Sequence, residues 1–304
     1  MANETQFVRK HYDAVAANYH EQYESGSLYD VSKPYPANYF RLQLLLECFL
    51  KKRMRRVVEV GVGEGTPLAE LGRQGIDVWG FDISPEMVSK CRQTMEKNGL
   101  PPEHILLADI QDPSTYAGVL KDGLFDGLTA MGVMPHIKDE HAVLENMAAL
   151  VRPGGTVFIE FRNKLFSLFT FNRYTADFIL NDLLGDVSPR LKQVVAKDLE
   201  SRLRMDMPPT RERVGQSDAP GYDAILSRFH NPLEVPDLFR KHGFGDIKLL
   251  WYHYHPAMPY LEKHLPEEFR TEAIRLEREL SDWRGLFLCS AFVVEAAKKE
   301  GPEK

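Results

Sequence analysis

Cysteine is scarce in this sequence, and long apolar runs are absent. The 304 residues include only three cysteines, Cys48, Cys91 and Cys289, which are too far apart for the Cys-x-x-Cys spacing of zinc and thiol redox sites. No segment approaches the roughly 18 apolar residues that span a bilayer, and the first residues lack the apolar core of a signal peptide. Scattered unpaired thiols are typical of a reducing compartment. We therefore expect a soluble cytoplasmic protein with no membrane partner.

An excess of positive charge is also missing. The formal net charge is −6, from 38 Lys and Arg against 44 Asp and Glu, and an acidic surface does not attract phosphate backbones over a distance. The sequence therefore predicts a small-molecule partner and no nucleic acid. Its 43% hydrophobic and 27% charged residues are typical of a globular protein. Because the chain exceeds one minimal domain of about 150 residues, we expect a large domain with an insertion, or two domains; a homo-oligomer is possible.

The first 55 residues have a helical pattern. Apolar and aromatic side chains recur at helix-like spacing over residues 4–24, Tyr12 and Tyr19 among them, and again over residues 38–51. A stretch rich in glycine, serine and proline separates the two segments. We expect two helices here, the first of them amphipathic.

From Arg56 onward the pattern changes to short apolar strands that alternate with helices. Strands are expected at 57–60, 77–81, 105–108, 127–130 and 156–161, and helices at 67–73, 85–97 and 140–150. Such alternation predicts a parallel sheet with helices on both faces, wound by right-handed crossovers. Residues 56–161 are thus predicted to form an α/β core.

Residues 162–235 interrupt this alternation. They begin with an apolar, aromatic run at 165–171 and later contain several arginines. The rest of the chain is expected to form two strands and a helix between them, at 247–253, 286–295 and 267–281. We therefore expect 162–235 to be an inserted helical cap over the substrate, and 236–304 to complete the core sheet before a polar tail.

The decisive local feature is a glycine loop between the first strand and its helix. Residues 59–65 read Glu-Val-Gly-Val-Gly-Glu-Gly, and glycine is needed where the backbone turns tightly or approaches a ligand closely. The helix that follows presents free N–H groups and the positive end of its dipole. The dinucleotide fingerprint Gly-x-Gly-x-x-Gly fails, because Thr66 stands at its third glycine position. The loop is therefore not typical of a pyrophosphate site.

Asp82 follows Gly61 by 21 residues and comes at the end of the second predicted strand. A carboxylate there is placed to accept hydrogen bonds from both ribose hydroxyls of a bound adenosine. The alternative is that Asp82 only caps the helix that follows it. Because ligands of open α/β sheets sit beyond the carboxyl ends of the strands, Asp82 and the glycine loop are predicted to face one site.

With its surroundings, the motif Glu-x-Gly-x-Gly-x-Gly resembles the signature of class I S-adenosylmethionine-dependent methyltransferases. Further features similar to that family are Tyr12 and Tyr19 in the first helix, Asp109-Ile110 after the third strand, Phe125-Asp126 and Met131-Gly132-Val133 around the fourth, and Arg152-Pro153-Gly154-Gly155 before the fifth. The resemblance covers residues 7–161 well, and 236–295 only in element order. It implies a Rossmann-like, seven-stranded, mostly parallel sheet whose last strand, 286–295, runs antiparallel beside the fifth.

The resemblance also implies S-adenosylmethionine as the cofactor and an N-terminal helix that closes over it as a lid. The residues implied for the cofactor are Tyr12, Tyr19, Glu59, Gly61, Gly63, Gly65, Asp82, Ile83, Asp109, Ile110 and Met131. Two alternatives stay open: Asp109 can be a plain turn residue, and the tyrosines can be core residues of an amphipathic helix.

Two histidines are candidates for a general base. A hydroxyl acceptor has a high pKa and needs a base within hydrogen-bond reach, and imidazole suits that role near neutral pH. His136 lies just past the fourth strand and His230 ends the insertion, although either can instead be a structural loop residue. His253 and His255 alternate along a strand without a carboxylate at ligand spacing, so no metal is expected.

Arg162, Arg173 and Arg228 are the candidates for substrate binding. Arginine suits phosphate or carboxylate groups, and Arg162 and Arg173 flank the aromatic run close to the end of the fifth strand. The insertion as a whole holds eleven Lys and Arg against ten Asp and Glu. Most of its arginines are therefore expected on solvated faces.

The sequence thus predicts an enzyme that methylates a small molecule, with a hydroxyl on a sugar or another polar, anionic metabolite as the leading acceptor. N- or C-methylation of a specialised metabolite or isoprenoid is the alternative, because Phe166, Phe169 and Phe171 can line an apolar pocket. The rivals from other classes are a nicotinamide-dependent oxidoreductase and an inactive methyltransferase-like binding protein. Thr66 argues against the first, and the intact glycines and Asp82 argue against the second.

Overall fold

The core of the structure is one seven-stranded sheet in the order β3-β2-β1-β4-β5-β7-β6. A computed structural model describes residues 2–16, 23 and 25–300 of the chain. The strands are β1 (Arg56–Val60), β2 (Asp77–Asp82), β3 (Ile105–Leu107), β4 (Phe125–Ala130), β5 (Val151–Arg162), β6 (Phe244–Tyr254) and β7 (Cys289–Lys298). Strands β1 to β5 pair in parallel, and β7 is antiparallel to both β5 and β6. The predicted mixed sheet, with an antiparallel strand beside the fifth, is confirmed.

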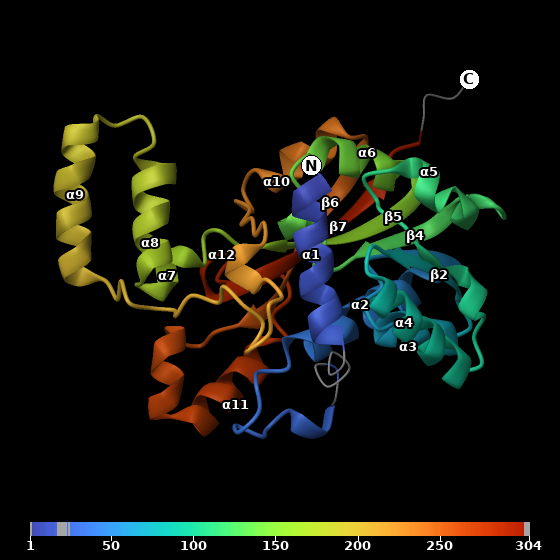
Figure 1. Ribbon diagram of the computed structural model, residues 1–304, viewed down its shortest axis with the longest axis horizontal. Helices are drawn as coiled ribbons and strands as arrows, with labels where there is room; N and C mark the ends of the chain where they lie inside the picture. Colours follow the sequence, from blue (N-terminus) through green and yellow to red (C-terminus); the bar gives the residue numbers. More distant parts are fainter. Residues whose placement is uncertain (1, 17–22, 24, 301–304) are drawn as a thin grey trace.

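Helices cover both faces of the sheet (Figure 1). On one face pack α2 (Ala37–Lys52), α3 (Thr66–Arg73) and α4 (Pro85–Lys97), and on the other α5 (Pro113–Tyr116), α6 (Glu140–Leu150) and α10 (Val235–Lys241). Residues of a strand alternate between its two faces, so successive side chains of β5 contact the helices on opposite sides of the sheet. Phe158 contacts Phe49 of α2 with ring centroids 4.8 Å apart, and Phe161 contacts Phe239 of α10 at 5.9 Å. The core therefore lies on both sides of the sheet.

The N-terminal helix is described over only part of its predicted length. Helix α1 covers Ala2–Val15, and the chain leaves the α-helix at Ala16, whereas the pattern extends to residue 24. Residues 17–22 and 24, and Tyr19 with them, lie outside the described residues. The role predicted for Tyr19 therefore stays a prediction. No described helix is long and apolar enough to cross a bilayer.

The helix before the last strand ends early. Helix α11 covers Pro266–Leu276, whereas the pattern predicts helix up to residue 281. The next residue, Glu277, accepts hydrogen bonds from the main-chain N–H groups of His253 and Tyr254 at 3.1 and 3.0 Å. The helix thus ends just before the residue whose carboxylate binds the end of β6.

The last strand also begins later than predicted. The strand was predicted to begin at residue 286. Residues 286–288 instead belong to a helical turn, α12 (Gly285–Leu288), and β7 starts at Cys289. Gly285 packs so closely on Trp251 that an added Cβ would lie 2.2 Å from the indole ring. The packing of this turn on β6 therefore overrides the apolar, strand-like pattern.

The insertion after β5 has two parts. The first is a helical arm, at the left of Figure 1, that projects away from the sheet. It consists of α7 (Ser167–Thr170), α8 (Arg173–Asp177), the π-helix η6 (Phe178–Leu183) and α9 (Pro189–Arg202). The second part, the return segment 203–234, is largely irregular and reaches the end of β5, where the His230 N–H donates to the Arg162 carbonyl at 2.7 Å. The insertion is thus helical in its arm, whereas a loop meets the sheet.

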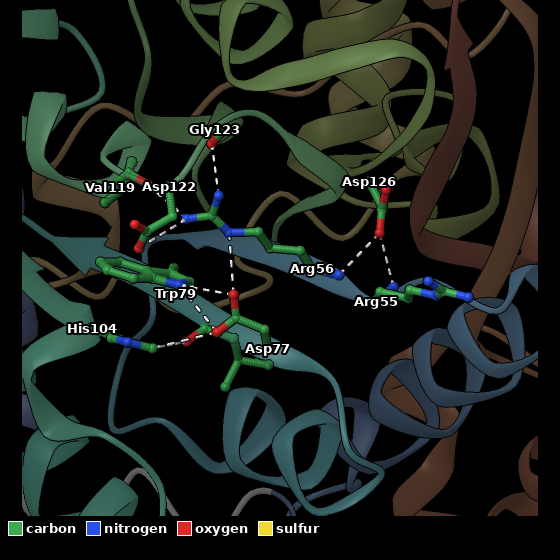
Figure 2. A network of polar contacts seen from close by, with 10 residues as sticks. Arg55, Arg56, Asp77, Trp79, His104, Val119, Asp122, Gly123 and Asp126 are labelled. Carbon is green, nitrogen blue, oxygen red and sulfur yellow. Dashed lines mark hydrogen bonds and ion pairs between the residues drawn. The ribbon is translucent and has the colours of Figure 1, made fainter.

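A polar network joins the amino ends of the parallel strands, at the edge opposite to the glycine loop (Figure 2). The carboxylate of Asp126, at the start of β4, accepts hydrogen bonds from the main-chain N–H groups of Arg55 and Arg56 at 2.9 and 3.0 Å. It also accepts one from Arg152 Nε at 2.6 Å. Burial acts to raise the pKa of Asp126, but these hydrogen bonds outweigh it and lower the pKa. Asp126 therefore links β4 to β1 and to the start of β5.

The side chain of Arg56 forms the second half of this network. Its guanidinium pairs with Asp77 at 3.2 Å and donates to the Gly123 carbonyl at 2.9 Å. The same group lies 4.6 Å from the centroid of the Phe125 ring, and Trp79 Nε1 donates to Asp77 at 3.2 Å. These contacts tie the starts of β1, β2 and β4 together and leave the opposite edge of the sheet for ligands.

We expect Asp126→Ala to lower the free energy of unfolding by about 1–3 kcal/mol, because it leaves two main-chain N–H groups and Arg152 without their acceptor. Urea unfolding at pH 7 measures the change. The matched control is Asp122→Ala, since Asp122 lies 4.0 Å from Arg56 and its side chain is 62% exposed. That variant should stay within about 0.5 kcal/mol of the wild type. Equal losses in the two variants would contradict the role of Asp126.

Candidate functional site

A cavity of about 740 Å³, open to solvent, lies at the carboxyl ends of the parallel strands. Of the residues predicted to bind the cofactor, those that line it are Tyr12, Gly61, Gly63, Asp82, Ile83, Asp109, Ile110 and Met131. No lysine or arginine stands among the described residues of its wall, whereas two aspartates do. Because pyrophosphate sites need donors and positive charge, this cavity suits a neutral or positively charged ligand.

The glycine loop adopts a backbone that other residues rarely reach. Gly61, Gly63 and Gly65 have φ angles of 74°, 55° and 90°, all in the left-handed region that favours glycine. The Gly61 N–H donates to the Phe81 carbonyl at 2.8 Å and so holds the loop against the end of β2. Gly65 does not line the cavity; a Cβ there would lie 2.6 Å from Cys91 Sγ. Its glycine therefore serves the packing of α3 on α4.

Asp82 joins the loop to the end of β2. Its Oδ2 accepts from the Gly63 N–H at 3.0 Å and its Oδ1 accepts from the Ser84 N–H at 2.9 Å. Burial raises the pKa of Asp82 to about 6, although these main-chain hydrogen bonds act to lower it. The cap of α4 is the Ser84 hydroxyl, which accepts from the Met87 N–H at 3.0 Å. Asp82 is thus more than a helix cap, because it lines the cavity and shapes the loop.

Glu59 lies beneath the loop and does not line the cavity. Its side chain is 2% exposed, and among the described residues Oε2 has no hydrogen-bond partner. Burial raises the pKa of Glu59 to about 8, against the opposing charge of Arg41. Arg41 itself forms a buried ion pair with Glu160. A cation bound above the loop would therefore stabilise the ionised form of Glu59.

The loops after β3 and β4 complete the floor of the cavity. Asp109 Oδ1 accepts from the Gln111 N–H at 2.9 Å, so this residue forms the turn that was the alternative and also lines the cavity. Ile110 and Met131 are both buried apolar residues of the wall. The floor is therefore apolar, with one carboxylate at its rim.

Helix α1, near the centre of Figure 1, contributes Thr5, Val8 and Tyr12 to the cavity wall. The Tyr12 hydroxyl lies 3.0 Å from His136 Nε2. Asp13 accepts a hydrogen bond from the Ser84 hydroxyl, and His11 Nδ1 lies 2.8 Å from the Pro220 carbonyl oxygen. One turn of this helix thus contacts the loop after β4, the start of α4 and the return segment.

His136 has a defined tautomer. Its Nδ1 lies 2.6 Å from the Leu226 carbonyl oxygen, and because a carbonyl only accepts, Nδ1 carries the proton and Nε2 is the proton acceptor. Burial lowers the pKa of His136 to about 4, although the hydrogen bond to Leu226 acts to raise it. His136 lines the cavity. It is therefore a neutral imidazole with an accepting nitrogen at the site.

The structure does not bring His230 and Arg228 to the cavity wall. His230 is buried against Phe161, with ring centroids 4.8 Å apart, and its Nε2 lies 2.9 Å from Glu140 Oε1. Arg228 pairs with the same carboxylate at 2.7 Å and donates to the Lys138 carbonyl at 3.0 Å. Both side chains attach the return segment to the start of α6.

Arg162 and Arg173 lie on the side of the site that the insertion forms. The Arg162 Cζ is 4.2 Å from the centroid of the Tyr222 ring, and Tyr222 meets His136 edge to face at 5.7 Å. Arg173 pairs with Asp223 at 3.8 Å. The end of β5 and the return segment are therefore next to His136.

Two residues of the return segment were missed by sequence reasoning. Leu226 supplies the carbonyl that orients His136, and Tyr222 lies between His136 and Arg162. Every residue has a main-chain carbonyl, so the sequence does not indicate which carbonyl orients a histidine. A single tyrosine in an irregular segment is not a motif. Only the aromatic character of Tyr222 could have drawn attention to it.

His253 is a further polar group at the carboxyl edge of the sheet. Its Nδ1 lies 2.8 Å from Ser290 Oγ on β7, and its ring stacks on Tyr35 with centroids 5.5 Å apart. Its φ of 60° is uncommon for a residue with a side chain. Within the described ranges, no three or more His, Cys, Asp or Glu side chains are grouped so as to hold a metal ion.

Comparisons with known proteins agree with this geometry. Residues 58–159 match the family model described as a methyltransferase domain. The chain is similar to the ubiquinone biosynthesis O-methyltransferase of Bordetella avium (strain 197N), with 30% identity over 143 residues, which are 47% of this chain and 57% of that protein. The protein of the same name from Pectobacterium atrosepticum is 29% identical over 110 residues, 36% of this chain and 44% of that protein. The chain thus spans about half the length of these curated relatives.

A solved structure shares the fold over nearly the whole chain. It is the magnesium protoporphyrin IX methyltransferase from Synechocystis PCC 6803 with bound SAH, with a TM-score of 0.54 and 14% identity, covering 97% of this chain and all of that one. The matched domain contains the glycine loop, Asp82, Asp109 and Met131. Residues 58–159 thus form a methyltransferase domain, and the chain shares the fold of a methyltransferase whose solved structure holds SAH.

Proposed function

We propose that this chain transfers the methyl group of S-adenosylmethionine to a hydroxyl of a small polar molecule, with His136 as the general base. The observation that carries the proposal is that His136 presents an accepting Nε2 in the same cavity as the glycine loop and Asp82. The names of the curated relatives, O-methyltransferases of ubiquinone biosynthesis, support oxygen as the acceptor atom.

The cavity residues are assigned to parts of the cofactor. Asp82 is assigned to the ribose hydroxyls, because each of its oxygens has a lone pair beyond the one that a main-chain N–H uses. The apolar wall and the absence of Lys and Arg from its described residues suit a ligand with a sulfonium. The residues assigned to the cofactor are Tyr12, Gly61, Gly63, Asp82, Ile83, Asp109, Ile110 and Met131.

The chain's own part in the reaction is alignment and removal of a proton. S-adenosylmethionine supplies an electrophilic methyl group on its sulfonium, and holding an acceptor oxygen in line can contribute about 7–11 kcal/mol. The accepting Nε2 of His136 contacts the Tyr12 hydroxyl, and in the complex an acceptor hydroxyl takes that place. The imidazole would take the hydroxyl proton as the oxygen bonds to the methyl carbon, and the carbon–sulfur bond would break to leave S-adenosylhomocysteine.

The function is tested with methyl-labelled S-adenosylmethionine and a panel of catechols, sugars, sugar phosphates and hydroxy acids. We expect a labelled methyl ether, identified by mass spectrometry, together with demethylated cofactor. Label on nitrogen or carbon would overturn oxygen as the acceptor. Calorimetric binding of NADH without binding of S-adenosylhomocysteine would overturn the whole proposal in favour of an oxidoreductase.

We expect Asp82→Asn to weaken the affinity for S-adenosylhomocysteine by about 10- to 100-fold, because a hydrogen bond to a charged group contributes about 1.5–3 kcal/mol. Isothermal titration calorimetry at pH 7.5 measures the affinity. Asp77→Asn is the matched control, since Asp77 begins the same strand at the opposite edge of the sheet. Asp77→Asn should bind like the wild type, and an unchanged affinity in Asp82→Asn would contradict the ribose assignment.

The affinity for S-adenosylhomocysteine measured in these titrations should depend on pH. The pKa of Asp82 is raised to about 6, first of all by burial, and ribose hydroxyls donate to the charged carboxylate. The wild type should therefore bind at full strength above that pKa and lose affinity as the pH falls below it, by at most about tenfold per pH unit. The Asp82→Asn variant should lack this step.

We expect His136→Gln to lower kcat on the identified acceptor by about 10²- to 10⁴-fold, the usual contribution of a general base, while binding of S-adenosylhomocysteine is retained. His230→Gln is the control that separates catalysis from folding, because His230 contacts Glu140 and Phe161 outside the cavity. It should lose stability and keep kcat. Normal turnover in His136→Gln would rule out His136 as the base.

A further inference from the structure

Three arginines lie around the return segment, and one carboxylate pairs with two of them. Asp223 accepts from the main-chain N–H of Arg211 at 2.6 Å, and its carboxylate lies 3.4 Å from Arg211 Nη2 and 3.8 Å from Arg173 Nη2. Within residues 25–300, no carboxylate lies at ion-pair distance from Arg162. The nearby Glu160 is already paired with Arg41. Three positive charges against one negative charge leave an excess of two.

Aromatic rings hold these arginines in place. The Tyr222 ring lies 4.2 Å from Arg162 Cζ and 5.1 Å from Arg211 Cζ, and the Tyr174 ring lies 4.8 Å from Arg173 Cζ. Stacking on a ring stabilises a guanidinium without using its N–H groups, so those of Arg162 stay available for a planar, bidentate ligand. Arg173 Nη2 also donates to the Tyr174 hydroxyl at 3.2 Å. The cluster is therefore preorganised to donate several hydrogen bonds.

One donor of the cluster is buried without an acceptor. Arg173 Nε is shielded from solvent and has no hydrogen-bond partner among the described residues. A buried donor without a partner is destabilising, so an acceptor atom bound here would relieve that cost. This observation is independent of the charge excess and points to the same kind of ligand.

The cluster adjoins the proposed base and is distinct from the cofactor cavity. Tyr222 meets His136 at 5.7 Å on one side and Arg162 at 4.2 Å on the other. None of Arg162, Arg173 and Arg211 lines the cavity that holds the glycine loop and Asp82. A group bound by the arginines would thus belong to the methyl acceptor.

We propose that Arg162, Arg173 and Arg211 form a binding site for a phosphate group of the methyl acceptor, so that the substrate is a phosphorylated small molecule with a free hydroxyl. The inference rests on the proposed function and names its substrate class. A phosphate monoester carries a charge of about −1.5 to −2 at neutral pH, which matches the excess of two positive charges, and its oxygens accept bidentate hydrogen bonds from arginine. A carboxylate would neutralise only half of that excess.

The test uses phenyl phosphate as the probe, with benzoate as the monoanionic counterpart and sodium chloride at matched ionic strength. Each is titrated by calorimetry into the full-length protein, both free and saturated with S-adenosylhomocysteine. We expect phenyl phosphate to bind and benzoate to bind at least tenfold more weakly. Benzoate binding as tight as that of phenyl phosphate, or no phenyl phosphate binding beyond the chloride blank, overturns the proposal.

Three variants, one of them a control, locate the probe. Arg162→Gln should weaken phenyl phosphate at least tenfold, whereas the matched control Arg204→Gln, in the same insertion and paired with Asp206 at 2.9 Å, should bind like the wild type. Asp223→Asn should bind the probe more tightly, because it removes the competing negative charge. Misfolding would not produce that gain. Equal affinities in Arg162→Gln and Arg204→Gln would contradict the site.

Failure of this inference and failure of the proposed function are distinguishable. If the protein binds S-adenosylhomocysteine but the probe does not bind, the methyltransferase proposal stands and the phosphate site is wrong. If S-adenosylhomocysteine does not bind, the proposed function fails, and the titrations of the free protein still decide whether the arginine cluster binds phosphate.

Discussion

The carboxylate of Asp82 links two parts of the cavity wall directly and a third through Ser84. One oxygen accepts from Gly63 in the glycine loop, and the other accepts from Ser84 at the start of α4. Ser84 in turn caps α4 and donates to Asp13 of α1. Because burial disfavours the charge of Asp82 and main-chain N–H groups favour it, the loop geometry and the ionised state of this carboxylate support one another.

On the side of the site away from the glycine loop, the contacts come from a short part of the return segment. Pro220 and Leu226 supply the carbonyls that bind His11 and His136, and Tyr222 stands between His136 and Arg162. The core sheet thus forms the cofactor cavity, whereas the insertion supplies the groups beside it. Such a division lets one fold serve different acceptors, because function resides in sites built on the fold.

Local signals in the sequence predicted the elements that have local causes. Helices α4 and α6 have the bounds expected from their sequences, and side chains of Ser84 and Asp139 cap them. The start of β7 was predicted wrongly, because Gly285 turns against Trp251 on another strand. Of the site, the sequence predicted most of the cofactor wall, whereas Glu59 and Gly65 lie behind that wall.

The sequence by itself determined the parallel core, the glycine loop and the cofactor class, because strand–helix periodicity and glycine spacing are properties of neighbouring residues. Only the tertiary structure decided which side chains face the acceptor. It placed His136 on the cavity wall and His230 against Glu140. It also brought Arg173 and Arg211 to Asp223, and Arg162 to the neighbouring Tyr222. The contact that orients His136 joins residues 90 positions apart, and no local pattern specifies which side chains of an irregular segment meet across such a distance.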